Sequence, residues 1–92
     1  MIRSFKDRLT EDLAAGGAEA HSRDVGERAV RKLFLLETVT RLEDLRVPPG
    51  NRLEALSGDR RGAHSIRVNE QWCICFVWRD GDAYDVEFVD YH

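Results

Sequence analysis

The sequence predicts an α+β fold in which two N-terminal helices pack on a mainly antiparallel, twisted β-sheet. Apolar residues recur with a helical period of about 3.6 in the first half of the chain and with a period of two from residue 52 onwards. Helices followed by a run of strands are typical of α+β domains. The chain has 92 residues, of which 42% are hydrophobic, and this is enough for one core but not for two. We therefore expect residues 1–92 to form a single compact domain.

The N-terminal segment predicts a short strand and a short helix. Residues 1–5 alternate apolar and polar side chains, which is the pattern of a strand. Residues 7–15 then place Leu9 and Leu13 four positions apart, on one face of a helix. Two consecutive glycines follow and are expected to end this helix, because glycine readily adopts the left-handed conformation found at helix C-termini.

The longest predicted helix begins at Asp24. Aspartate is a favoured N-cap, and Glu27 three residues later completes the spacing of a capping box. The apolar stripe of this helix comprises Val25, Ala29, Leu33, Leu36 and Val39, and is widened by Val30 and Phe34. Thr40 and Glu43 repeat the capping-box spacing, so a short helical turn is expected over residues 41–46, ended by the two prolines that follow.

Strands are predicted for the rest of the chain, with a tight basic loop at residues 58–62. They cover residues 52–57, 63–68, 72–78 and 83–91. One buried face requires Trp72, Ile74, Phe76 and Trp78 to share a side with Tyr84, Val86 and Phe88. A three-residue loop, Arg79-Asp80-Gly81, with Gly81 left-handed in a bulge, achieves this. The same logic pairs Ile66 with Ile74.

The opposite face of the sheet carries the more reactive side chains. It is expected to be concave and open to solvent, and it comprises Ser65, Arg67, Cys73, Cys75, Val77, Asp85, Glu87, Val89 and Tyr91. Arg67 and Cys73 are predicted to lie directly across from each other. Cys73 and Cys75 offer only two metal ligands, so we expect small buried thiols and no metal or cofactor.

Charge and composition restrict the possible classes of protein. The formal net charge of −3 argues against a general nucleic-acid binder. Twelve of the fourteen basic residues are Arg, which suits bidentate contact with phosphate, although Arg also serves simply as a solubilising cation. The sequence has no run of roughly 18 apolar residues, its charged first residues lead us to expect no signal peptide, and its two cysteines suit a reducing compartment. We expect a cytoplasmic protein without membrane contact.

Several residues could carry chemistry. Asp90, Tyr91 and His92 form a titratable cluster suited to proton transfer, or else a frayed terminus. Arg60 and Arg61 stand between glycines, either as a phosphate clamp or as an ordinary solvated turn. His64 alternates with Ile66 along its strand, which favours a hydrogen-bonded core or rim residue over a functional one.

These residues together resemble a known family. The combination of G-D-R-R-G at 58–62, S-I-R-V-N-E-Q-W at 65–72 and the final D-Y-H is similar to RelE/ParE-superfamily toxins of the HigB type, also called plasmid maintenance system killer proteins. The resemblance covers essentially the whole chain. It implies the toxin of a type II toxin–antitoxin pair, which enters the ribosomal A site and cuts mRNA there without metal.

The resemblance also implies partners and roles. The partner would be a HigA-like antitoxin with a helix-turn-helix, through which alone the toxin would contact operator DNA. Arg67, Asp90, Tyr91 and His92 match catalytic positions. Arg60 or Arg61 matches a basic position that contacts RNA, and we count His64 with these RNA-binding candidates.

One position departs from the family pattern. The Trp is usually followed by Arg-Ile, whereas this chain has Cys73-Ile74. Loss of a cation that stabilises a charged transition state typically costs on the order of 10²–10³ in rate. The alternative function is therefore a catalytically weakened relative that binds antitoxin or ribosome without efficient cleavage.

Overall fold

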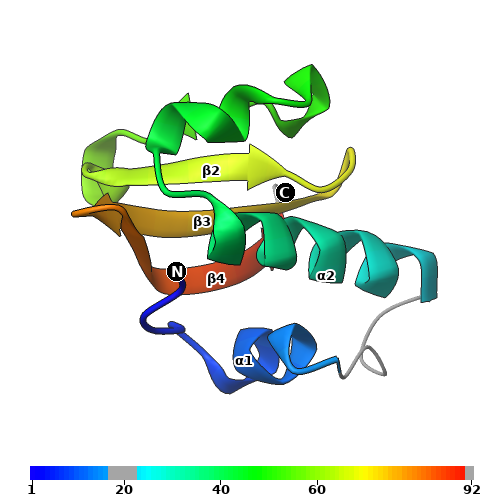
Figure 1. Ribbon diagram of the computed structural model, residues 1–92. Coiled ribbons are helices and arrows are strands. Elements are labelled where there is room, and N and C mark those ends of the chain that lie inside the picture. Colours follow the sequence, from blue (N-terminus) through cyan, green and yellow to red (C-terminus); the bar gives the residue numbers. More distant parts are fainter. Residues whose placement is uncertain (17–22, 91–92) are drawn as a thin grey trace.

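The computed structural model of the protein describes residues 1–16 and 23–90 (Figure 1). Its elements are, in chain order, α1 (Arg8–Ala14), α2 (Arg23–Thr38), the 3₁₀ helices η1 (Leu42–Arg46) and η2 (Pro49–Asn51), β1 (Glu54–Ala55), the 3₁₀ helix η3 (Gly58–Arg60), β2 (Ala63–Arg67), β3 (Trp72–Arg79) and β4 (Asp82–Asp90). The strands form one antiparallel sheet in the order β1-β2-β3-β4. The predicted α+β class is confirmed. Among the described residues, no helix is long and apolar enough to cross a membrane.

Helix α1 is held against the last strand by a buried threonine. Asp7 caps the helix, and its Oδ1 accepts a hydrogen bond from the Thr10 backbone nitrogen at 2.7 Å. The Thr10 hydroxyl is buried and accepts a hydrogen bond from the Phe88 backbone nitrogen at 3.0 Å. The helix predicted over 7–15 is confirmed, but its inner face is formed by Thr10 and Leu13, whereas Leu9 is half exposed.

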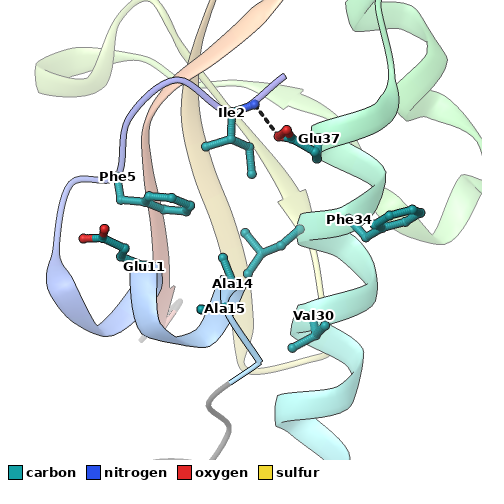
Figure 2. Close-up of a pocket in the computed structure, with 9 residues that line it drawn as sticks. Ile2, Phe5, Glu11, Ala14, Ala15, Val30, Phe34 and Glu37 are labelled. Carbon is teal, nitrogen blue, oxygen red and sulfur yellow. Dashed lines mark hydrogen bonds between the residues drawn. The ribbon is translucent and has the colours of Figure 1, made fainter.

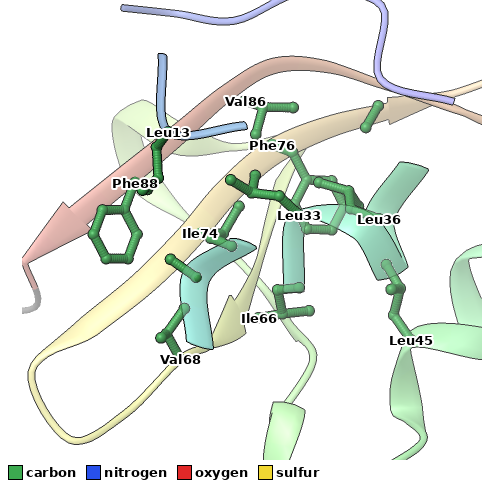
Figure 3. Close-up of a cluster of buried hydrophobic side chains, with 12 residues drawn as sticks. Leu13, Leu33, Leu36, Leu45, Ile66, Val68, Ile74, Phe76, Val86 and Phe88 are labelled. Carbon is green, nitrogen blue, oxygen red and sulfur yellow. The ribbon is translucent and has the colours of Figure 1, made fainter. Parts of the chain in front are cut away.

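Helix α2 supplies most of the helical side of the core, as predicted. Figure 3 shows Leu33 and Leu36 packed over side chains of the sheet. Phe34 is 68% exposed, so it does not widen the buried stripe. One residue advances a helix by about 100°, which carries position 34 away from Leu33.

Neither predicted helix cap is observed. Helix α2 already includes Arg23, so Asp24 lies inside its first turn, where it pairs with Arg28 at 3.4 Å. Helix η1 forms over the predicted residues. The residue before it is Arg41, which makes no capping side-chain hydrogen bond, so Thr40 is not its cap.

The β3–β4 hairpin corrects the predicted loop. Arg79 pairs with Asp82 across a two-residue turn, in which Asp80 (φ 53°) and Gly81 (φ 84°) are both left-handed, as in a type I′ turn. The extra residue is instead Asp85 (φ 52°), in a bulge between the Val77–Tyr84 and Cys75–Glu87 pairs.

The bulge decides which β4 side chains face the helices. Val86 and Phe88 do so, as predicted, whereas Tyr84 pairs with Val77 on the opposite face. The predicted pairing of Ile66 with Ile74 is confirmed. The buried aromatic layer is extended by Trp72, whose ring stacks on Phe88 at 4.7 Å.

The strands predicted at the two edges of the sheet are shorter than expected. The strand predicted over 52–57 is reduced to β1, and Arg52 before it is left-handed (φ 45°). The strand predicted over 1–5 is reduced to two parallel bridges, Ile2–Ala83 and Phe5–Val86, along the outer edge of β4. These bridges tie the N-terminal segment to the last strand, and the Ile2 backbone nitrogen also donates a hydrogen bond to Glu37 Oε2 of α2 at 2.7 Å (Figure 2).

We predict that Phe76→Ala lowers the free energy of unfolding by about 3–5 kcal/mol, because a large aromatic side chain that is 1% exposed leaves a cavity. Phe34→Ala removes the same atoms from an exposed position and should change stability by less than about 0.5 kcal/mol. Urea unfolding of both variants tests this. Equal losses would contradict the placement of Phe76 in the core and of Phe34 on the surface.

Candidate nucleic-acid interface

The sheet face directed away from the helices carries the predicted residues of β2 and β3 and also Tyr84, which was predicted on the other face. Arg67 on β2 pairs directly with Cys73 on β3, and Ser65 pairs with Cys75. The face is less open than expected, because Ser65 and Cys73 are both 4% exposed and Cys75 is 6% exposed. The prediction that position 73 faces solvent is therefore wrong, although its register is right.

Long charged side chains cross this face. Lys6 Nζ and Arg60 Nη1 lie 3.5 Å and 3.4 Å from the same carboxylate oxygen, Oε2 of Glu87. Together with Arg61 and Cys75 they line a pocket of about 160 Å³. Both cations are well exposed, and each ion pair stabilises the fold by at most about 1 kcal/mol. Lys6 and Arg60 can therefore release Glu87 and bind another anion.

The two thiols lie side by side under these cations. Their Sγ atoms are 3.9 Å apart. The hydrogen bond from Cys73 lowers the pKa of Cys75 to about 7, with help from Arg60 and Lys6 and against burial and Glu87. No group of three or more metal-ligating side chains converges within residues 1–16 and 23–90.

The β2–β3 turn links Arg67 to the end of β4. Arg67 Nε donates a hydrogen bond to the Asn69 carbonyl at 3.0 Å. Asn69 Oδ1 accepts from the backbone nitrogens of Gln71 and Trp72, both at 2.8 Å. The Gln71 amide in turn donates to Asp90 Oδ2 at 2.9 Å. This chain of contacts links two of the four predicted catalytic residues, Arg67 on β2 and Asp90 on β4, across β3. The other two, Tyr91 and His92, lie outside the described residues.

The predicted RNA-binding residues divide between the two faces. Arg60 and Arg61 lie over the same face as Arg67 and line the pocket beside Cys75. His64 points to the other side of the sheet, where its ring lies 6.2 Å from that of Phe76. Its Nδ1 is buried and finds no hydrogen-bond partner among the residues described. The structure therefore separates His64 from the other candidates and supports its interpretation as a core or rim residue.

Helix α2 contributes cations that were not predicted from the sequence to lie near Arg67. Arg28, Arg31, Lys32 and Arg67 line a common pocket of about 340 Å³. A neighbouring groove of about 580 Å³ shares Arg28 and Arg67 and reaches Gln71. The spacing of 28, 31 and 32 places these residues on one helical face. That pattern was available in the sequence, but it occupies the polar side of the helix.

Comparison with known proteins identifies the family of the chain. A family model described as "RelE-like toxin of type II toxin-antitoxin system HigB" matches residues 4–92. Toxin HigB-1 of Vibrio cholerae is 47% identical over 62 residues, which cover 67% of this chain and 64% of that relative, slightly less than two thirds of its length. Endoribonuclease HigB of Proteus vulgaris is 36% identical over an alignment that covers both chains completely.

A solved structure shows the same fold at lower sequence identity. The crystal structure of a histidine-to-glutamine mutant of YafQ from E. coli matches with a TM-score of 0.69, over 99% of this chain and 94% of that chain, at 14% identity. Fold and family match together define a small RelE-like toxin. The chain belongs to the HigB family of type II toxin–antitoxin systems.

We predict that Asn69→Ala lowers the free energy of unfolding by about 1–2 kcal/mol, because two backbone donors in the turn lose their acceptor. Asn69→Asp keeps an oxygen in the same place and should stay close to the wild type. Urea unfolding of the pair separates the hydrogen bonds from other effects of the substitution. A destabilised Asn69→Asp variant would contradict the assignment to the Oδ1 atom.

Proposed function

We propose that this toxin is a ribosome-dependent mRNA endonuclease that needs no metal and that inhibits translation and growth. The observation that carries the proposal is the contact chain from Arg67 through the Asn69–Trp72 turn to Asp90. Arg67 in β2 and Asp90 in β4 are connected through this turn, and the sequence continues from Asp90 into Tyr91 and His92. The full-length relative named Endoribonuclease HigB supports the same activity.

The reaction requires proton transfer and charge stabilisation. The RNA 2′-hydroxyl must lose its proton and attack the adjacent phosphorus, and the departing 5′-oxygen must gain a proton. Asp90, Tyr91 and His92 are the groups proposed to move these protons. Arg67 is proposed to stabilise the negative charge that grows on the phosphoryl oxygens.

The other cations are proposed to bind the RNA backbone. Arg60 and Arg61 lie over the same face as Arg67 and would contact neighbouring phosphates. The His64 ring points to the other face of the sheet and is not proposed to join them. Cys73 provides no charge where the family pattern has an arginine. Arg28 lines the groove next to Arg67, and a cation from α2 can compensate in part for that loss.

The proposed partners follow from the family. The toxin would be neutralised in the cytoplasm by a HigA-like helix-turn-helix antitoxin, and would reach operator DNA only through it. The ribosomal A site would hold mRNA in the geometry for attack. Because such orientation can supply several kcal/mol of a barrier, the isolated protein should cut free RNA poorly.

We predict that Arg67→Ala lowers the rate of mRNA cleavage on translating ribosomes by about 10²–10³-fold, because a cation at the transition state is lost. The matched control is Arg8→Ala. Arg8 is exposed on α1 and pairs only weakly with Asp12 at 3.8 Å. Primer extension on ribosome-bound mRNA measures both. An Arg67→Ala variant that cuts at the wild-type rate would exclude Arg67 from the reaction.

We predict that His92→Gln abolishes growth arrest on expression without antitoxin, because the proposed proton-transfer group is removed. Antitoxin binding and the urea midpoint should be unchanged. Growth curves, combined with primer extension on cellular mRNA, provide the measurement. Growth arrest with intact mRNA in the wild type would reject cleavage itself, and full toxicity of His92→Gln would reject the role of the histidine.

A further inference from the structure

A pocket between α2 and the end of β2 gathers positive charge in a protein whose net charge is negative. Its lining comprises Arg28, Arg31, Lys32, Leu35, Gly50, Arg67 and Val68, and its volume is about 340 Å³. Four of these seven residues are cations and none is acidic. Cations held close together repel one another, and a bound anion offsets this repulsion. The charge of this lining is therefore complementary to that of a polyanion.

The lysine of this pocket is held in place by the core. Lys32 Nζ donates a hydrogen bond to Asn51 Oδ1. Asn51 is fully buried, and its own amide donates to the carbonyls of Leu45 and Val47 at 3.1 Å and 3.3 Å. Burial lowers the pKa of Lys32, and a bound anion would offset this cost by favouring the charged amine. The Lys32 ammonium group is thus fixed in position before any ligand arrives.

The carboxylates of Asp24 and Glu70 do not neutralise the positive charge of the pocket. Arg28 Nε pairs with Asp24 at 3.4 Å along the exposed side of α2, and an exposed i,i+4 pair is worth only about 0.3–0.5 kcal/mol. Glu70 lines the neighbouring groove but not the pocket. An incoming phosphate can therefore compete for Arg28.

The pocket continues into the proposed cleavage site. The neighbouring groove of about 580 Å³ shares Arg28, Gly50, Arg67 and Val68 with it and ends at Gln71, whose amide contacts Asp90. In Figure 1 the turn between β2 and β3 lies above the N-terminal half of α2. A strand held in the pocket would thus pass Arg67 on its way to the end of β4.

We propose that this pocket binds backbone phosphates of the RNA strand next to the cleaved bond, with Arg28 and Arg31 as phosphate contacts and Lys32 as a fixed cation in the same lining. The assignment of the strand as the substrate rests on the proposed nuclease function. Arginine forks suit phosphate oxygens. The binding would be independent of sequence, because phosphate contacts position a strand without identifying its bases.

The test is the salt dependence of RNA binding by the intact protein. A fluorescently labelled single-stranded RNA is titrated with wild type and with the double variant Arg28→Gln/Arg31→Gln at several salt concentrations, and anisotropy is recorded. Each phosphate contact contributes about 0.7 to the slope of log K against log salt for single strands. We expect the double variant to lose about 1.4 in slope, and to bind more weakly at low salt.

The matched control is Arg8→Gln/Arg41→Gln. It removes the same charge from exposed arginines that pair with Asp12 and Glu43 on other elements. The control should keep the wild-type slope. Equal slopes in both double variants would overturn the proposal, because the effect would then come from overall charge.

Two further outcomes are decisive. Inorganic pyrophosphate is added to wild type and to the Arg28→Gln/Arg31→Gln variant in thermal unfolding. If pyrophosphate stabilises the wild type alone while RNA binding is the same in both, the pocket takes small free phosphates and the RNA assignment falls. If RNA binding depends on Arg28 and Arg31 but ribosome-bound mRNA stays intact, the nuclease function fails and the phosphate site stands.

Discussion

A single extra residue, Asp85 in the bulge of β4, determines which side chains of β4 face the helices and which face the other side of the sheet. Side chains alternate along a strand, so one added residue exchanges the faces of everything that follows. Beyond the bulge, Val86 and Phe88 lie under the helices, and Glu87 lies among the cations of the opposite face. The docking of α1 through Thr10 also depends on it, because the donor is the backbone nitrogen of Phe88.

The apolar pattern contains part of this information. It shows that one residue must be added between Trp78 and Val86 if both are to be buried, but a bulge at the turn and a bulge within the strand satisfy that requirement equally. The choice between them depends on Tyr84, which is amphipathic and fits either face, and whose ring is covered by Arg79 at 4.9 Å. Pairs between β2 and β3, such as Ile66 with Ile74, could be predicted because no bulge interrupts the alternation of that ladder.

The candidate site was predictable only where it follows a strand. Arg67 and Cys73 face each other because the alternation of two regular strands requires it. The cations of α2 were not predicted, because the hydrophobic period of a helix identifies only its buried side. A functional role for the polar side becomes visible only when the structure shows which element packs beside it. Burial of Cys73 was expected for a small thiol, but the covering of its sheet face was not, since a strand pattern does not reveal which long side chains will lie across it.

The borders of the sheet have a consequence for association. One border is β1, only two residues long, and the other is occupied by the N-terminal segment, whose backbone bonds to Ala83 and Val86 at 2.7–3.0 Å. Short or covered edges give little template for strand addition, which is a common route to aggregation and to β-augmentation. Along these segments, a binding protein or a second copy of this chain would therefore find little free strand backbone by which to extend the sheet.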